Sequence, residues 1–219
     1  MPENARSNPT RTRLLEEATR LFAERGYRAT SVAEICRAAK ANVAAVNYYF
    51  GGKEKLYDAA WRRAFEKAEA LAPLDAASPG TSLEEQLFRF VLAILRRTFD
   101  DGAGGWFSKL LYREMADPTI ALERIADEVF EPQTKRLRRL LTKTRPEADP
   151  EVVLRCIHSV IAQCAFYNFG RALRARVTGH DRPSPEEIEA LARHVARFSA
   201  AGIEATLNRT APSPGLQSP

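Results

Sequence analysis

Cysteine, histidine and long apolar runs are all scarce in this 219-residue sequence, and each shortage excludes a class of protein. Three cysteines do not make the dense disulfide framework of a small secreted domain. No apolar run approaches the roughly 20 residues that cross a bilayer, and the first residues lack the apolar core of a signal peptide. We therefore expect a cytoplasmic protein without a membrane partner.

Residue patterns of metal and catalytic sites are missing as well. The three histidines, His158, His180 and His194, fall in different segments, and no spacing fits a zinc site. There is no phosphate-cradling glycine loop and no G-x-S-x-G elbow. These absences predict a protein that is not an enzyme and carries no cofactor. A thiol redox sensor using Cys156 or Cys164 stays open as an alternative, although cysteine in an apolar helix usually behaves as a small hydrophobe.

Positive charge is concentrated in the first third of the chain. Residues 1–68 contain 13 Lys and Arg against 8 Asp and Glu, whereas residues 69–219 contain 20 of each. A localised basic surplus is typical of a surface that binds phosphates. The same surplus also fits ordinary solvated helix charges, so charge alone does not decide between them.

Apolar residues recur at helical spacing along the whole chain, without the alternation typical of strands. The pattern predicts an all-α fold of nine or ten helices. Glycine and proline separate the helices, with a loop at 72–81 and a kink or division at Pro132. The helices are expected at about 10–25, 31–39, 42–48, 53–71, 83–99, 106–115, 119–142, 151–176 and 185–208.

Three short helices within the basic segment have the spacing of a helix-turn-helix. Thr10 can cap the first helix and Gly26 can end it. Ser31 and Glu34 form the capping-box pattern S-x-x-E at the start of the second helix. In the third helix, capped by Asn42, the side chains expected to face inward are Val46 and Phe50. Those expected to face outward, towards a DNA major groove, are Val43, Ala44 and Asn47.

The same segment resembles the TetR family of bacterial regulators. The resemblance runs from about residue 11 to residue 57 and rests on three pieces in order, FAERGY at 22–27, ATSVAEI at 29–35 and NYYFGGKEKLY at 47–57. The stretches ANVAAVNYYF at 41–50 and LYREMADP at 111–118 are similar to the CecR-like branch. The resemblance implies an N-terminal three-helix DNA-binding domain followed by a helical domain that binds a ligand and dimerises.

Carried over position by position, the resemblance assigns DNA contacts to residues on the second, third and fourth helices. The implied phosphate contacts are Thr30 or Ser31, Asn42, Tyr48, Tyr49 and Lys53. The implied base-reading residues are Val43, Ala44, Ala45 and Asn47. Relatives often carry glycine at the position of Lys40, which could itself reach a phosphate, and histidine at the position of Tyr49. Ser31 may equally serve as a helix cap alone, and Tyr48 may pack on the first helix.

The expected domain order is a flexible arm at 1–9, the DNA-binding domain at 10–55, the second domain at 56–208 and a disordered tail at 209–219. Helix 151–176 is too apolar for a helix with one solvated face, which fits either a buried core or a dimer interface. The resemblance favours a homodimer. The expected interface residues are Phe166, Phe169, Leu191, Val195, Phe198 and Gly202.

The resemblance further implies a small-molecule effector that releases the protein from a double-stranded DNA operator by moving the helix at 53–71. An aromatic lining with few polar groups would suit a hydrophobic or amphipathic molecule. The expected lining residues are Phe65, Phe88, Leu92, Trp106, Leu110, Arg113, Met115, Phe130, His158, Gln163 and Tyr167. A transcriptional activator, or a DNA-binding protein that ignores ligands, remains an alternative to the ligand-released repressor.

Overall fold

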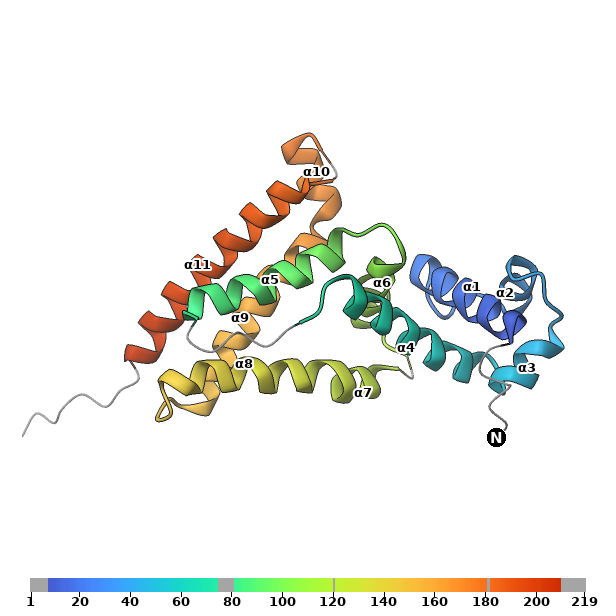
Figure 1. The fold of residues 1–219 in the computed structure, drawn as a ribbon, viewed down its shortest axis with the longest axis horizontal. Coiled ribbons are helices and arrows are strands. Elements are labelled where there is room, and N and C mark those ends of the chain that lie inside the picture. Colours follow the sequence, from blue (N-terminus) through green and yellow to red (C-terminus); the bar gives the residue numbers. More distant parts are fainter. Residues whose placement is uncertain (1–7, 75–80, 120, 181, 210–219) are drawn as a thin grey trace, which may run out of the picture. The chain divides into compact units, whose positions relative to one another are not determined.

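A computed structural model describes residues 8–74, 81–119, 121–180 and 182–209 (Figure 1). These residues are helical with short connections and include no strand, which confirms the predicted all-α class. The predicted tail, most of the N-terminal arm and most of the 72–81 loop lie outside the described residues. The α-helices are α1 Pro9–Arg25, α2 Val32–Ala38, α3 Ala44–Phe50, α4 Lys53–Leu71, α5 Leu83–Phe99, α6 Trp106–Ala116, α7 Leu122–Ile125, α8 Glu131–Thr144, α9 Pro150–Phe169, α10 Arg171–Thr178 and α11 Pro185–Arg209.

The helices form two compact units. The first unit joins two separate stretches of sequence, the chain up to Pro73 and residues Arg97–Glu123. The second comprises Leu74–Arg96 and the chain from Arg124 onward. The predicted boundary at residue 55 does not separate these units, because α4 packs along α1 and α6 and stays with the N-terminal helices.

The core of the first unit lies between α1, α4 and α6. Leu14, Ala18 and Phe22 recur at four-residue spacing on α1 and are fully buried. The Phe22 ring meets Tyr57 of α4 edge to face, with the ring centroids 4.9 Å apart. Because burying a large apolar side chain contributes about 1.5–3 kcal/mol, this seam fixes α1 on α4. Phe107 of α6 extends the same aromatic core.

The second unit is built around α9, which packs against α8 on one side and α11 on the other. Val153, Ile157 and Val160 form the buried stripe of α9, and Val195 and Ile203 lie buried on α11. Helix α5 meets α11 through the ion pair of Glu84 with Arg197 at 3.6 Å and through the Arg193 guanidinium, which lies 4.4 Å from the centre of the Phe88 ring.

Several predicted helix bounds are corrected by the structure. The helix expected at 151–176 divides at Gly170, where a Cβ atom would approach the carbonyl oxygen of Phe166 to 2.8 Å. The helix expected at 119–142 divides into α7, a π-helical segment at Ala126–Phe130 and α8, with Pro132 in the first turn of α8. The first helix is capped by Asn8 rather than Thr10, because the Asn8 side chain accepts a hydrogen bond from the backbone N–H of Thr10.

By length and composition alone, α9 could cross a membrane, which corrects the expectation that no segment reaches this length. An apolar helix at the core of a protein passes the same test. Only 28% of the most apolar stretch of α9 is buried within this chain, so much of its apolar surface is uncovered.

Candidate nucleic-acid interface

Helix α2 begins with a complete capping box. The Ser31 hydroxyl accepts a hydrogen bond from the Glu34 backbone N–H at 3.2 Å, and the Glu34 carboxylate accepts one from the Ser31 backbone N–H at 2.8 Å. These two bonds hold the pKa of Glu34 below its usual value. The helix is only seven residues long, so the cap and the buried Ile35 and Cys36 define its position.

Lys40 lies in the turn between α2 and α3 and has a φ angle of 50°. It is the single non-glycine residue with positive φ in the described part of the chain. A left-handed backbone costs a residue with a Cβ atom about 1–2 kcal/mol. The turn is closed by a hydrogen bond of 2.9 Å from the Ala41 N–H to the Cys36 carbonyl, and it leaves the Lys40 side chain exposed. The position therefore has the backbone conformation that glycine adopts most easily.

Helix α3 separates its buried and exposed residues sharply. Val46 is fully buried and Phe50 is 8% exposed, as predicted. The Asn42 carboxamide oxygen accepts a hydrogen bond of 2.9 Å from the Ala44 N–H, so Asn42 fixes the start of the helix. The opposite face of the helix consists of exposed Val43, Ala44, Asn47 and Tyr48, with Ala45 half-buried at its edge.

Two aromatic residues and one lysine flank the exposed face of α3. Tyr48 is 82% exposed, and its ring meets Tyr49 edge to face with the centroids 4.8 Å apart. The Tyr48 side chain therefore does not pack on α1, which was the alternative to a DNA contact. The Lys53 ammonium at the start of α4 lies 4.3 Å from the centre of the Tyr27 ring, and burial lowers its pKa.

Thr30 does not belong with these exposed groups, and its predicted phosphate contact is corrected. The side chain is 1% exposed, and its hydroxyl donates to the carbonyl oxygens of Gly26 at 2.8 Å and Leu21 at 3.3 Å. Thr30 therefore stabilises the connection between α1 and α2. Of the two residues proposed for this contact, exposed Ser31 is the one whose hydroxyl can reach a phosphate.

The C-terminal end of α6 binds the end of α1, the turn before α2, and α4. The Arg113 guanidinium donates to the carbonyl oxygens of Ala23, at 3.0 Å, and Glu24 at the end of α1. Asp117 pairs with Arg28 at 3.1 Å. These contacts hold the end of α1 and the turn before α2, which are far from α6 in sequence. They make α6 part of the frame that positions α2 and α3.

A buried carboxylate completes this frame. Glu114 is 1% exposed and accepts hydrogen bonds from the Tyr57 hydroxyl at 3.1 Å and the Thr119 hydroxyl at 2.8 Å. A buried charge with this many donors is satisfied, and losing one partner would leave the others unpaired. The sequence signal for this group was the run LYREMADP at 111–118, which was noted as a resemblance but not assigned to the frame.

The predicted effector residues are divided between the two units. Phe65, Trp106, Leu110, Arg113 and Met115 lie in the first unit, and Phe88, Leu92, Phe130, His158, Gln163 and Tyr167 lie in the second. The structure gives the surroundings of three of them. Leu110 is fully buried in the first core, Arg113 is bound to α1, and the Gln163 amide donates to the Ser199 hydroxyl of α11 at 3.0 Å. Met115 is 46% exposed and His158 is exposed, so neither encloses a cavity within its own unit.

The predicted dimer residues fall into two groups. Phe166, Phe169 and Phe198 are more than half exposed, and a Cβ atom on exposed Gly202 would meet nothing. Val195 is 2% exposed inside its own unit, which corrects its assignment to an interface surface, and Leu191 is half-buried. The prediction missed Leu173 and Val177 of α10, which are 64% and 79% exposed. Their four-residue spacing after Phe169 was the available signal.

The structure also disfavours the thiol-sensor alternative. Cys156 and Cys164 are buried, and burial raises the pKa of both thiols, that of Cys164 to about 12. A thiol reacts as its thiolate, so such groups are poor sensors at neutral pH.

Comparisons with known proteins agree with this geometry. Residues 14–60 match the model of the bacterial regulatory proteins of the tetR family, and residues 83–203 match the C-terminal domain of the HTH-type transcriptional dual regulator CecR. The chain is 28% identical to CecR of Shigella flexneri over 190 residues, which cover 80% of this chain and 84% of CecR. It is 32% identical over 116 residues to the probable regulator YttP of Bacillus subtilis, covering 52% of this chain and only 55% of YttP.

A solved structure shares the fold. The TetR-like transcriptional regulator from Rhodococcus sp. RHA1 superposes with a TM-score of 0.61 at 22% identity, covering 88% of this chain and 96% of the other. These relatives are DNA-binding transcriptional regulators and not enzymes. The chain belongs to the TetR family of transcriptional regulators, in its CecR-like branch.

Proposed function

We propose that the protein is a cytoplasmic, homodimeric repressor that binds a pseudo-palindromic operator and leaves it when a small hydrophobic or amphipathic effector binds. The observation that supports this most directly is α3, with two buried anchors and an opposite face of exposed small and polar side chains. An α-helix with such a face fits the major groove of B-DNA. In this proposal the DNA-binding part is residues 10–55.

Each exposed group has a proposed role. Asn47 reads a base edge, adenine by preference, because a carboxamide offers both a donor and an acceptor to that base. Val43, Ala44 and Ala45 contact bases through their apolar surfaces. Phosphates are held from both ends of α3 by the side chains of Ser31, Lys40, Asn42, Tyr48, Tyr49 and Lys53.

Selective enrichment of random DNA on the purified protein tests this proposal. We expect a pseudo-palindrome whose half-site centres lie about 34–36 Å apart, one turn of B-DNA. Asn47→Ala should then relax the preference at one base position, by about 1–3 kcal/mol. Lys53→Ala should weaken binding to all sequences alike. No enriched sequence, or a preference that Asn47→Ala leaves intact, would contradict the role of α3.

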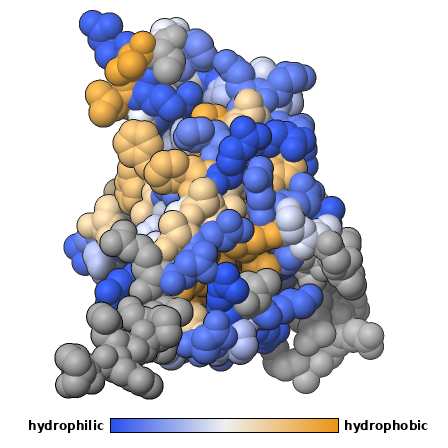
Figure 2. All heavy atoms as spheres, turned by 90° about the vertical axis from the view of Figure 1, so that its left-hand side faces the viewer, coloured by the Kyte–Doolittle hydropathy of each residue, from blue (hydrophilic) through white to orange (hydrophobic). Residues whose placement is uncertain are grey.

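The proposed dimer surface is the α9–α11 patch, which we define as Phe166, Phe169, Leu173, Val177 and Phe198. These are large apolar side chains, each more than half exposed in the single chain. Figure 2 shows apolar side chains gathered on a face of the molecule. Contiguous apolar surface of this kind marks an interaction site. Sedimentation of the purified chain tests the dimer.

Release by an effector requires a path from the ligand to α3. In our proposal this path is the frame in which α6 holds α1 through Arg113 and α4 through Glu114. A ligand that favours a shifted α6 or α4 would change the separation of the two α3 helices and weaken DNA binding. It must bind the two states with affinities that differ by a few kilocalories per mole.

A second mode of regulation is favoured by one relative. CecR is described as a dual regulator, a name that covers activation as well as repression. Transcription measured from the enriched operator, with and without the protein, separates the two modes. Higher transcription with the protein present would replace the repressor by an activator.

A further inference from the structure

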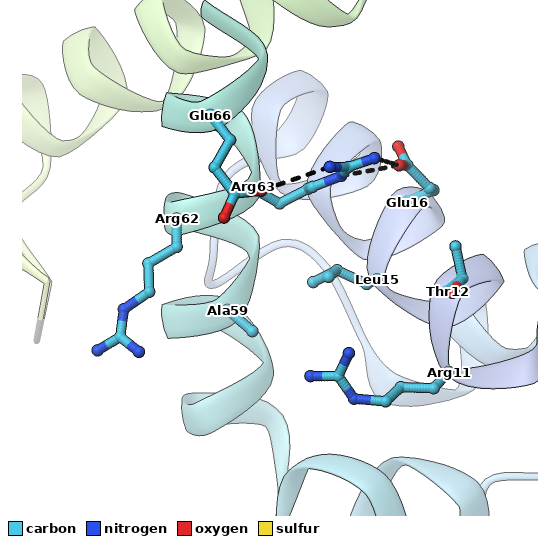
Figure 3. Close-up of a pocket in the computed structure, with 8 residues that line it drawn as sticks. All are labelled: Arg11, Thr12, Leu15, Glu16, Ala59, Arg62, Arg63 and Glu66. Carbon is cyan, nitrogen blue, oxygen red and sulfur yellow. Dashed lines mark hydrogen bonds and ion pairs between the residues drawn. The ribbon is translucent and has the colours of Figure 1, made fainter. Parts of the chain in front are cut away.

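A groove of about 390 Å³ runs between α1 and α4 in the first unit, separate from the exposed face of α3 (Figure 3). Its walls carry three arginines and two glutamates, an excess of positive charge. The charged residues are Arg11 and Glu16 on α1, and Arg62, Arg63 and Glu66 on α4.

The charges along the groove are divided into a paired and an unpaired group. Arg63 binds Glu16 at 2.7 Å and Glu66 at 3.4 Å, so this arginine is neutralised. Among the described residues, neither Arg11 nor Arg62 has a carboxylate partner. In Figure 3 the Arg11 side chain extends from α1 towards α4, and the Arg62 side chain extends from α4 away from the ion-paired cluster.

The unpaired arginines lie beside the DNA-binding helices. The Arg11 guanidinium lies 5.0 Å from the centre of the ring of Phe50, the last residue of α3, and this contact holds it in place. Arg62 is exposed on α4. Arg11 and Thr12 also belong to the first turn of α1, a 17-residue helix, where the helix dipole favours an anion.

Two guanidinium groups at an open groove beside a helix N-terminus match the chemistry of a phosphate group. We propose that this groove binds the phosphodiester backbone of DNA flanking the bases read by α3. The groove belongs to the same unit as α3, so we take the backbone of the bound duplex as its phosphate source. The proposal rests on the DNA binding proposed above and adds contacts that carry no base specificity.

The dependence of DNA affinity on salt measures these contacts directly. Each phosphate contact contributes about 0.9 to the slope of log affinity against log salt. With a mixed-sequence duplex of about 40 base pairs, roughly four turns of B-DNA, the double variant Arg11→Ala/Arg62→Ala should have a slope shallower by about 1.8. Arg62→Ala alone should account for about half of this change, and Arg62→Lys should restore most of the affinity.

Arg20→Ala is the matched control, because it removes the same charge from α1 at a residue that is already paired with Glu17 and Glu24. It should leave the slope unchanged. Arg62 is exposed, so Arg62→Ala remains informative even if loss of the Arg11–Phe50 contact destabilises the double variant.

Three outcomes are distinguishable. If the unchanged protein binds no DNA at low salt, the proposed function fails. If it binds DNA and the arginine variants behave as Arg20→Ala does, the groove proposal alone is overturned. Titration with pyrophosphate tests the other phosphate source. If pyrophosphate binds and Arg62→Ala abolishes that binding while the salt slope of DNA binding is unchanged, the groove is a small-anion site and the DNA contact is overturned.

Discussion

The exposed surfaces of helices α3 and α9 differ in their chemistry. Helix α3 has seven residues and exposes small and polar side chains, whereas α9 has twenty residues and exposes phenylalanine. Helix α3 is anchored by buried Val46 and Phe50, and α6 binds the neighbouring helices α1 and α4 through Arg113 and Glu114. The exposed side of α9 and α10 consists instead of large apolar side chains, among them Phe166, Phe169 and Leu173.

This difference separates two kinds of recognition. A polar surface that carries positive charge binds a highly charged polymer, and its affinity falls with salt because counterions are released. An apolar surface binds by removing area from water, which added salt does not weaken in this way. We therefore expect DNA binding and dimerisation to respond differently to salt.

The largest expected effect comes from charging the apolar surface. Phe198→Glu places a carboxylate in the proposed interface, where truncating one central aromatic already costs about 2 kcal/mol or more. We expect the dimer dissociation constant to rise by about 30-fold or more, which analytical ultracentrifugation measures.

Leu122→Glu is its control, because Leu122 is 42% exposed on α7 and lies outside the patch. If Phe198→Glu remains dimeric at the concentrations at which Leu122→Glu does, the contrast between the two surfaces is lost.

The next effect concerns the buried carboxylate that supports α3 from a distance. Glu114→Gln keeps the shape of the side chain but removes the charge that accepts from Tyr57 and Thr119. Hydrogen bonds to a charged group contribute about 1.5–3 kcal/mol, so the free energy of unfolding should fall by roughly 1–3 kcal/mol in urea titrations. An unchanged midpoint would mean that this carboxylate does not stabilise the frame. Exposed Glu123→Gln on α7 is the control and should have little effect.

Stability at alkaline pH tests the contact between Tyr57 and Glu114 through ionisation of the tyrosine. Burial raises the pKa of Tyr57 well above its usual value of 10.0, and the charge of Glu114 raises it further. The stability that Tyr57 contributes is therefore complete below pH 10 and is lost as pH rises towards the folded pKa, because the unfolded chain ionises first. Urea midpoints between pH 8 and pH 11 should decline less for Tyr57→Phe than for the unchanged protein. Equal declines would contradict this.

The smallest expected effect is at Lys40, where substitutions separate a change in the free energy of unfolding from a change in DNA binding. Lys40→Gly relieves a positive φ and should stabilise the protein by about 1 kcal/mol, whereas Lys40→Ala should not. If Lys40 reaches a phosphate, both variants should lower the salt slope of DNA binding by about 0.9. Lys55→Ala, an exposed lysine on α4, serves as the comparison. A slope unchanged in both Lys40 variants leaves Lys40 with no part in DNA binding.

Local signals predicted the DNA-binding helices well. The Ser31–Glu34 capping box and the inward pair Val46 and Phe50 each depend on residues within a few positions of one another. Short-range geometry is set by backbone sterics and hydrogen bonds, so sequence spacing suffices to infer it.

Contacts between distant residues could not be predicted in this way. Thr30 has the side chain of a phosphate contact, and only the position of α1 shows that its hydroxyl is bound to the carbonyl oxygens of Gly26 and Leu21. From the sequence alone, the guanidinium of Arg113 likewise suits the anchoring of a ligand. Only the packing of α6 beside α1 shows that this group donates to a carbonyl oxygen of α1. The division at Gly170 depends on the approach of its backbone to Phe166, which helical periodicity does not record.

The first unit has a consequence for biosynthesis. Its helices come from two stretches of the gene product, and residues Arg97–Glu123 complete the part that starts at the N-terminus. While the ribosome is still making α5, the α1 carbonyls and the Tyr57 hydroxyl lack Arg113 and Glu114. The nascent regulator therefore completes its DNA-binding unit only after more than half of the polypeptide has been synthesised. A fragment ending at Pro73 should lack the contacts that hold this unit together.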